Sequence, residues 1–174
     1  LYAASTKGTV PVLVLPNGEV IDESLAIMQW TLGNNDPLSW LPTSKERTAT
    51  CDALIANNDI AFKHHLDRYK YATRYEDVDE IEHREACGVI LRGLDAILHQ
   101  HTHLLGDGFT LADAAVAPFV RQFALADRSW FDAQEWTALR IWLDRFMQSD
   151  RFLAIMQKYA LWQVGDAPRE VLWS

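Results

Sequence analysis

The sequence is poor in cysteine and in basic residues, and it has no long apolar run. Its two cysteines, Cys51 and Cys87, form neither a CxxC motif nor a paired metal-binding spacing, so no disulfide framework is expected and a reducing cytoplasm fits. Sixteen basic against twenty-four acidic residues give a formal charge of −8, which argues against binding to nucleic acid or an anionic membrane. Apolar runs such as residues 10–15 are far too short to span a bilayer.

What remains describes an ordinary soluble globular chain. Hydrophobic residues make up 49% of 174 residues and charged residues 23%, enough for one domain or two small subdomains with a packed core. Residues 9–15 are apolar and β-branched, the turn residues 16–18 follow, and residues 19–21 predict a second short strand, so residues 9–22 indicate a hairpin. Asp22 then offers a helix cap, and residues 23–32 carry apolar side chains at helical spacing up to Gly33.

Residues 34–42 are polar and punctuated by proline, which is typical of a linker. The rest predicts about five helices, because four pairs of a capping residue and an acid three positions later recur. These pairs are Thr43 with Glu46, Asp77 with Glu80, Thr110 with Asp113, and Asp132 with Glu135. A short last helix near Asp150 is expected to turn Phe152, Ile155, Met156 and Tyr159 inward. The fold class is therefore α+β.

Two features of the first 33 residues predict a binding site. A cis Val10–Pro11 bond would turn the N–H and C=O of Val10 outward, ready to pair with an extended peptide, although a proline that merely opens a strand is the more common case. Glu23 and Ser24 open a helix, where free N–H groups, a hydroxyl and a carboxylate suit an α-amino acid head group. Taken alone, plain capping would also explain that pair.

With these residues in place, the sequence resembles the cytosolic glutathione transferases. Residues 8–32, GTVPVLVLPNGEVIDESLAIMQWTL, are similar to the second half of their thioredoxin-like domain, and residues 109–123, FTLADAAVAPFVRQF, are similar to the capping box of their helical domain. The resemblance implies a partial thioredoxin-like, glutathione-binding unit at residues 1–33, a linker at 34–42, and an all-helical domain with a tail packing back at 43–174. The cysteine- or serine-type, Omega-like bacterial branches are closest, given Glu23 and Ser24.

The resemblance also implies roles for single residues. The backbone of Val10, next to a cis Pro11, would pair with the cysteinyl part of glutathione, while Glu23 and Ser24 would hold its γ-glutamyl group. Lys7 could meet the glycyl carboxylate, although a solvated lysine is the more common case. Two further residues, Thr110 and Asp113, would be structural, forming a buried capping box.

Residues 57–74 interleave polar and aromatic side chains without a clean apolar stripe, so this segment is expected to border a cleft. The resemblance makes His64, Arg68, Tyr69 and Tyr71 candidates for an electrophile pocket, with a solvated helix face as an equal alternative. A metal site at the adjacent His64 and His65 is not expected, because the two point to different faces and no third ligand stands at helical spacing.

The residue that activates the thiol in this family precedes the matching stretch, and neither cysteine replaces it. We therefore expect the sequence to be part of a longer protein that lacks its first βαβ unit here, with weak glutathione binding and no turnover on its own. The implied protein is a cytoplasmic homodimer that uses glutathione, without a metal, to conjugate an electrophile or reduce a mixed disulfide. The alternative is a non-catalytic, transferase-like interaction module.

Overall fold

The hairpin expected at residues 9–22 is present. In the computed structural model, which describes residues 2, 5–161 and 163–168, strands β1 (Val12–Val14) and β2 (Val20–Asp22) pair antiparallel. The turn between them is closed by hydrogen bonds in which Leu15 donates to the Glu19 carbonyl at 2.8 Å and Gly18 donates to the Leu15 carbonyl at 2.9 Å. Gly18 has a φ of 87°, a conformation that side-chain-bearing residues rarely adopt, so glycine permits this turn.

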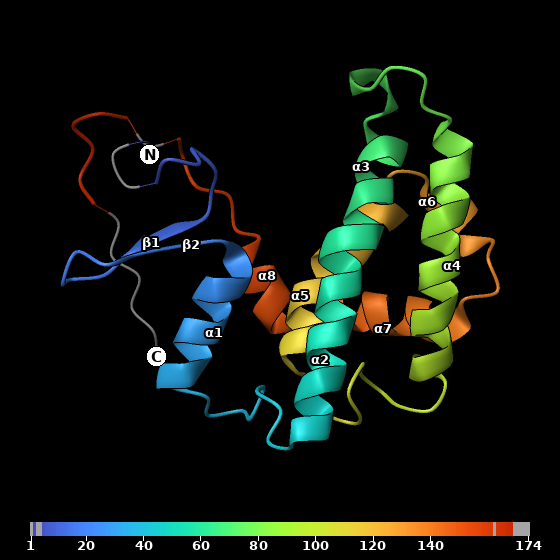
Figure 1. Ribbon diagram of the computed structural model, residues 1–174, viewed down its shortest axis with the longest axis horizontal. Helices are drawn as coiled ribbons and strands as arrows, with labels where there is room; N and C mark the ends of the chain where they lie inside the picture. The colour runs from blue at the N-terminus through green and yellow to red at the C-terminus, as the bar shows by residue number, and fades with distance from the viewer. Residues whose placement is uncertain (1, 3–4, 162, 169–174) are drawn as a thin grey trace.

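The chain is helical after the hairpin, and the fold is α+β (Figure 1). The helical elements are α1 (Ser24–Asn34), α2 (Lys45–Asn57), η1 (Asn58–Phe62), α3 (Lys63–Lys70), η2 (Ala72–Arg74), α4 (Glu80–Leu98), α5 (Leu111–Ala124), α6 (Arg128–Asp132), α7 (Thr137–Gln148) and α8 (Asp150–Ile155). No helix in the part of the chain that the structure describes has the length and apolar character of a membrane span.

The elements α2, η1 and α3 form one continuous rod, with a π-helical turn at η1. Its core-facing stripe consists of Cys51, Ile55, Asn58, Phe62 and Leu66, all buried. The expectation that residues 57–74 lack such a stripe was therefore wrong. One member of the stripe is the polar Asn58, so the apolar residues of this segment do not by themselves show the spacing of three and four that indicates a helix.

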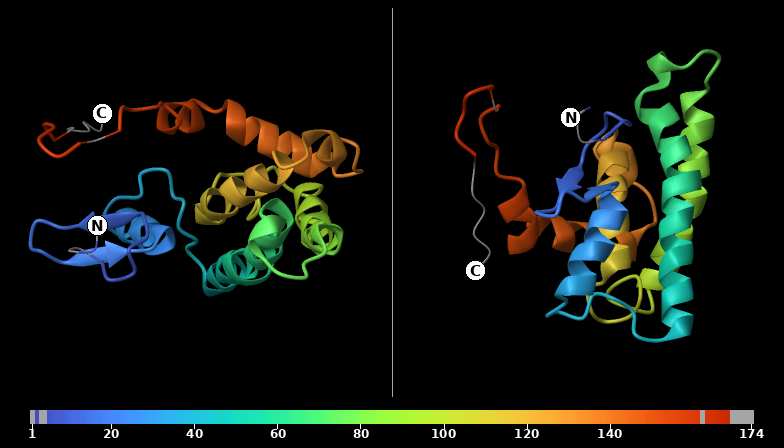
Figure 2. Two further views of the ribbon diagram at one scale, coloured as in Figure 1. Left: turned by 90° about the horizontal axis from the view of Figure 1, so that it is seen from above. Right: turned by 60° about the vertical axis from the view of Figure 1, so that its left-hand side comes forward.

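The hydrophobic core lies where the rod meets α4, α5 and α7. One face of α4 and one face of α7 are apolar and buried, namely Cys87, Leu91, Leu94 and Leu98, with Leu139, Leu143 and Phe146. Figure 2 shows the hairpin and α1 standing beside this bundle rather than within it. Leu25, Met28 and Leu32 of α1 pack against the core, so the small sheet is attached to the bundle through one helix face.

Two helix starts fall one or two residues later than predicted. The α2 helix is capped by Ser44, whose hydroxyl accepts from the N–H of Arg47 at 3.2 Å, and not by Thr43. The α4 helix is capped by Asp79, whose carboxylate accepts from two N–H groups of the first turn, and not by Asp77. Each true cap adjoins or nearly adjoins another residue with a capping side chain, so the sequence alone leaves the choice open.

Two other predicted caps were wrong because tertiary contacts replace them. Asp132 ends α6 and pairs with Arg128, while α7 begins after Trp136. The N–H of Leu139 in the first turn of α7 instead donates to the buried Asp95 of α4 at 2.8 Å. Asp22, predicted as the cap of α1, ends strand β2, and Glu23 stands at the cap position without a side-chain cap.

The C-terminal segment does not pack as expected. Phe152 of α8 contacts Phe146, with ring centroids 4.9 Å apart, but Ile155, Met156 and Tyr159 are exposed. The expectation that these three face inward was wrong. Leu161 and Val164, in the described part of the tail, are 88% and 96% exposed, so these residues do not pack back onto the bundle.

Candidate functional site

A cluster of charged side chains lies where the hairpin meets α1. The Lys7 ammonium is 2.7 Å from the Glu23 carboxylate and 3.4 Å from that of Asp22. Asp22 also accepts a hydrogen bond from the hydroxyl of the buried Ser5 at 2.9 Å. Ser5 and Asp22 were missed as members of this cluster, because their pairing spans 17 residues and no local motif marks it.

Glu23 is held in an unusual backbone conformation at the first turn of α1. Its φ is 77° and its ψ is 130°, a region that is costly for a residue with a side chain. Ser24 follows as the first residue of α1, and both residues are exposed. Residues held in such conformations concentrate at binding sites, where surrounding contacts fix them. Here the contact is the ion pair between Glu23 and Lys7.

The charges of this cluster are stabilised by their neighbours. The hydrogen bonds to Glu23 and then to Asp22 raise the pKa of Lys7 above its usual range. The hydroxyl of Ser5, with Lys7 adding to it, lowers the pKa of Asp22. Both shifts favour the charged forms of Lys7 and Asp22, so the start of α1 presents charges of both signs.

Val10 and Pro11 lie at the entrance to β1, on the same hairpin. The Val10–Pro11 peptide bond is cis, as predicted, and Val10 is 79% exposed. Both residues precede Val12, which pairs with Asp22 across the hairpin. Val10 therefore lies at the entrance to β1, and the neighbouring strand β2 ends at Asp22 of the charged cluster; Figure 1 shows the two strands side by side.

Thr110 and Asp113 form the predicted capping box at the start of α5. Asp113 is fully buried, and its carboxylate accepts hydrogen bonds from the N–H and hydroxyl of Thr110 at 2.9 and 2.8 Å. It also accepts from the N–H of Leu104 at 3.0 Å and from the indole N–H of Trp142 at 2.8 Å. The structure thus places Asp113 in the core, tying α5 to α7.

The four candidates for an electrophile pocket lie in different surroundings. Tyr69 lines a cavity of about 490 Å³ near Arg84 and also contacts Phe123 of the core, and burial raises its pKa. Tyr71 is covered by the cationic groups of Lys70 and Arg74.

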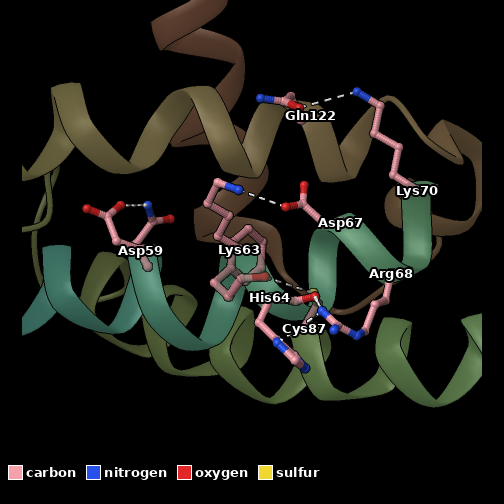
Figure 3. Close-up of polar contacts among 10 residues, drawn as sticks. Asp59, Lys63, His64, Asp67, Arg68, Lys70, Cys87 and Gln122 are labelled. Atoms are coloured by element: carbon pink, nitrogen blue, oxygen red, sulfur yellow. Dashed lines mark hydrogen bonds and ion pairs between the residues drawn. The ribbon is translucent and has the colours of Figure 1, made fainter. Parts of the chain in front are cut away.

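His64 and Arg68 pair with each other, because an Arg68 nitrogen lies 3.0 Å from Nδ1 of His64 (Figure 3). The guanidinium of Arg68 also lies over the ring of Tyr75, 4.6 Å from its centroid.

A third histidine, His83 of α4, joins His64 and His65 of α3. The ligand nitrogens of the three rings lie within 4.8 Å of one another, and the Nδ1 atoms of His65 and His83 are 2.7 Å apart. A third ligand was considered only at helical spacing, whereas this third histidine lies on a different helix. His83 is 18 residues from His65 in the sequence, so only the packing of α4 against α3 reveals it.

Neither cysteine is placed to act as a nucleophile. Both side chains are buried, Cys51 on α2 and Cys87 on α4. Burial raises the pKa of Cys51 to about 11 and that of Cys87 to about 12, so both remain thiols at neutral pH. This agrees with the expectation that neither cysteine replaces the activating residue.

Comparison with known proteins identifies the two parts of the chain. Residues 1–31 match the model of the glutathione S-transferase N-terminal domain, and residues 80–145 match that of the C-terminal domain. No curated protein sequence matches the chain.

Solved structures with the same fold include a glutathione S-transferase from Pseudomonas fluorescens, at 20% identity and a TM-score of 0.68 over 86% of this chain and 75% of that one. Another is Gtt2 from Saccharomyces cerevisiae, at 20% identity and a TM-score of 0.68 over 89% of this chain and 78% of that one. A third is a glutathione S-transferase from Rhodospirillum rubrum, at 22% identity and a TM-score of 0.73 over 91% of this chain and 75% of that one. With a matching domain model on each side of its linker, and this fold, the chain belongs to the glutathione S-transferase family.

Proposed function

We propose that the start of α1 binds the γ-glutamyl group of glutathione and that the protein uses this thiol to conjugate an electrophile or to reduce a mixed disulfide. The observation that carries the proposal is the exposed pair of Lys7 and Glu23 beside the first N–H groups of α1. The γ-glutamyl group is a zwitterion, with an ammonium and a carboxylate on one carbon. Its charges match those of this pair and of the helix N-terminus.

Binding would exchange one internal ion pair for two external ones. The ligand ammonium would take the Glu23 carboxylate, and the ligand carboxylate would take Ser24 and Lys7. An extended tripeptide spans about 10 Å, so Lys7 in its observed position serves the γ-glutamyl end and not the distant glycyl end. The backbone of the exposed Val10 would then pair with the cysteinyl residue.

Titration calorimetry of glutathione into the full chain tests this proposal. We expect Glu23→Gln, Lys7→Met and Ser24→Ala each to weaken binding by about two- to five-fold, because exposed ion pairs and helix-terminus contacts contribute about 0.3–1 kcal/mol each. Glu19→Gln is the matched control, since Glu19 is an exposed acid on the same hairpin and is expected to leave binding unchanged. Wild-type affinity in both Glu23→Gln and Lys7→Met would overturn the proposal.

The same proteins distinguish the possible activities. Conjugation of a chloronitroarene would show a transferase, and reduction of a glutathione mixed disulfide would show an oxidoreductase. Because residues 1–174 are expected to show no turnover on their own, glutathione binding without either reaction would fit both the enzyme and the non-catalytic interaction module. The assignment to a serine- or cysteine-type, Omega-like branch rests on Glu23 and Ser24 and remains part of this proposal.

We also propose that the protein is a homodimer in the cytoplasm. The reduced, buried Cys51 and Cys87 suit a reducing compartment. The exposed apolar side chains of Ile60 on η1 and Val89 on α4 suit a surface that a second copy covers. Light scattering during size-exclusion chromatography measures the mass directly. A monomeric mass at micromolar concentration would contradict the dimer. A dimeric mass in Val89→Glu would contradict the placement of Val89 in the interface.

A further inference from the structure

We propose that His64, His65 and His83 form a binding site for a divalent transition-metal ion of the zinc type, which would connect α3 to α4. The three rings come from two helices that pack against each other, and each offers a nitrogen within 4.8 Å of the others. Imidazole nitrogens suit zinc, copper and nickel, whereas magnesium and calcium require oxygen ligands. Three histidines with one open position is a known ligand set for zinc.

The rings are close to the arrangement that a metal ion requires. The centroids of His65 and His83 are 5.0 Å apart, as are those of His64 and His65, and those of His64 and His83 are 5.9 Å apart. Zinc–nitrogen distances of about 2.0–2.1 Å in a tetrahedron place ligand nitrogens about 3.4 Å from one another. None of the three rings is buried, so the site requires them to rotate from a spacing of up to 4.8 Å to this one.

A metal ion would occupy the place of the hydrogen bond between His65 and His83. The Nδ1 atoms of His65 and His83 are 2.7 Å apart, so one ring donates its N–H and the other accepts with its lone pair. When the metal takes both Nδ1 lone pairs, the donor's proton moves to its own Nε2. Two neutral rings therefore become two ligands without any net gain or loss of protons.

Charged side chains of both signs surround this site. Asp67 and Glu82 are the nearby acids, acting on His64 and His65 respectively, and both would attract a cation. The opposing charge is the guanidinium of Arg68.

Arg68 competes with the metal for His64. A guanidinium only donates hydrogen bonds, so Nδ1 of His64 is the acceptor in their 3.0 Å contact (Figure 3). If the metal binds Nδ1 of His64, Arg68 must leave that nitrogen. If it binds Nε2, the ring proton of His64 must move to Nδ1, which then no longer accepts from Arg68. In both cases the metal ion and the Arg68 guanidinium, both positively charged, come close together. Arg68 also donates to the His64 carbonyl at 3.2 Å and lies over the Tyr75 ring, so it has other partners when it leaves. Arg68 therefore sets the affinity of the site.

Calorimetric titration of Zn²⁺ into the full chain, free of any histidine tag and stripped of metal by a chelator, tests the proposal. We expect saturation at one equivalent and a loss of affinity of at least about tenfold in His65→Ala and in His83→Ala. His101→Ala is the matched control, because His101 is exposed and lies outside the cluster, and it should bind as wild type. Mg²⁺ should give no saturable binding.

Arg68→Met is expected to bind Zn²⁺ more tightly than wild type. Misfolding cannot increase affinity, so this variant tests the site independently of the variants that lose binding. Circular dichroism of each variant checks the helical content, and the visible spectrum of bound Co²⁺ reports four-coordinate geometry. The proposal is overturned if wild type shows no one-equivalent binding, if His83→Ala binds as wild type, or if Mg²⁺ binds equally well. Weaker binding by Arg68→Met would overturn the role given to Arg68.

Discussion

Asp113 is expected to be among the most sensitive residues for stability, although it touches no part of the proposed binding site. Its fully buried carboxylate accepts four hydrogen bonds, from the N–H of Leu104, the N–H and hydroxyl of Thr110, and the indole N–H of Trp142. Asp113→Ala leaves three buried N–H donors without a partner. Each such donor costs about 1–3 kcal/mol, so we expect a loss of about 3–9 kcal/mol of unfolding free energy.

Asp113→Asn separates hydrogen bonding from the size of the side chain. The amide oxygen can still accept from Leu104 and Trp142, and the hydroxyl of Thr110 can rotate to accept from the amide nitrogen. Only the N–H of Thr110 then lacks a partner, so the expected loss is about 1–2 kcal/mol. Asp52→Asn is the matched control, because Asp52 is exposed on α2, and it should change stability by no more than about 0.5 kcal/mol.

Urea unfolding followed by circular dichroism measures these differences from the midpoint and slope. A double-mutant cycle adds a sharper test, because Trp142→Phe removes one of the stranded donors. We expect Trp142→Phe to cost less in the Asp113→Ala background than in wild type. A loss below about 1 kcal/mol for Asp113→Ala, or equal losses for Ala and Asn, would refute the reasoning.

Three further effects should be measurable. The buried thiols of Cys51 and Cys87 have pKa values of about 11 and about 12, above the ordinary value of about 8.5. Unfolding above about pH 8.5 therefore releases protons, and the unfolding free energy should fall by up to about 1.4 kcal/mol per pH unit for each thiol. Urea unfolding at a series of alkaline pH values measures this slope, and Cys87→Ala should reduce it. The pKa of Asp22 is lowered, chiefly by Ser5. Its contribution to folding stability is therefore present above its ordinary pKa of about 3.9 and is lost as the pH falls below that value. The melting temperature of Asp22→Asn should therefore fall less in acid than that of wild type. Leu91→Ala, at a fully buried position on α4, should cost about 2–5 kcal/mol in the same urea assay, and a smaller loss would mean that this stripe is poorly packed.

The features that the sequence predicted well are those determined within a few residues. The hairpin depends on an apolar strand, a turn with Gly18 and a second strand, and the capping box depends on Thr110 and Asp113 alone. In both, the chemical signal and the structure lie within one turn or one strand pair. Sequence reading therefore identified them without knowledge of the packing.

Helix starts were less predictable because neighbouring residues compete for the same role. Ser44 caps α2 although Thr43 precedes it, and Asp79 caps α4 although Asp77 is nearby. Asp77 has a φ of 52° and lies in the turn that leads into α4. Which of two good caps is used depends on where the chain turns, and packing around the preceding loop decides this.

The parts that the sequence could not reveal are those built across distance. His83 reaches His65 only because α4 packs on α3, and Asp95 replaces the expected cap of α7 from another helix. In the rod, the polar Asn58 occupies a core position, so the apolar count failed there. Each failure concerns a residue whose partner is set by tertiary contact, for which one sequence holds no local signal.

The two acids at the starts of α1 and α5 show how burial, rather than motif, separates binding from stability. Glu23 and Asp113 both stand at helix starts with a hydroxyl residue nearby, so their sequence patterns are alike. Asp113 is inaccessible to solvent and fully occupied by fixed donors, so no ligand can reach it. The Glu23 side chain is 63% exposed, and its hydrogen-bonding partner is the ammonium of Lys7, whose side chain is 51% exposed. A partner of that kind can be exchanged for the ammonium of a ligand at little cost, because exposed ion pairs contribute under about 1 kcal/mol. Glu23 can therefore serve recognition while Asp113 serves only the core.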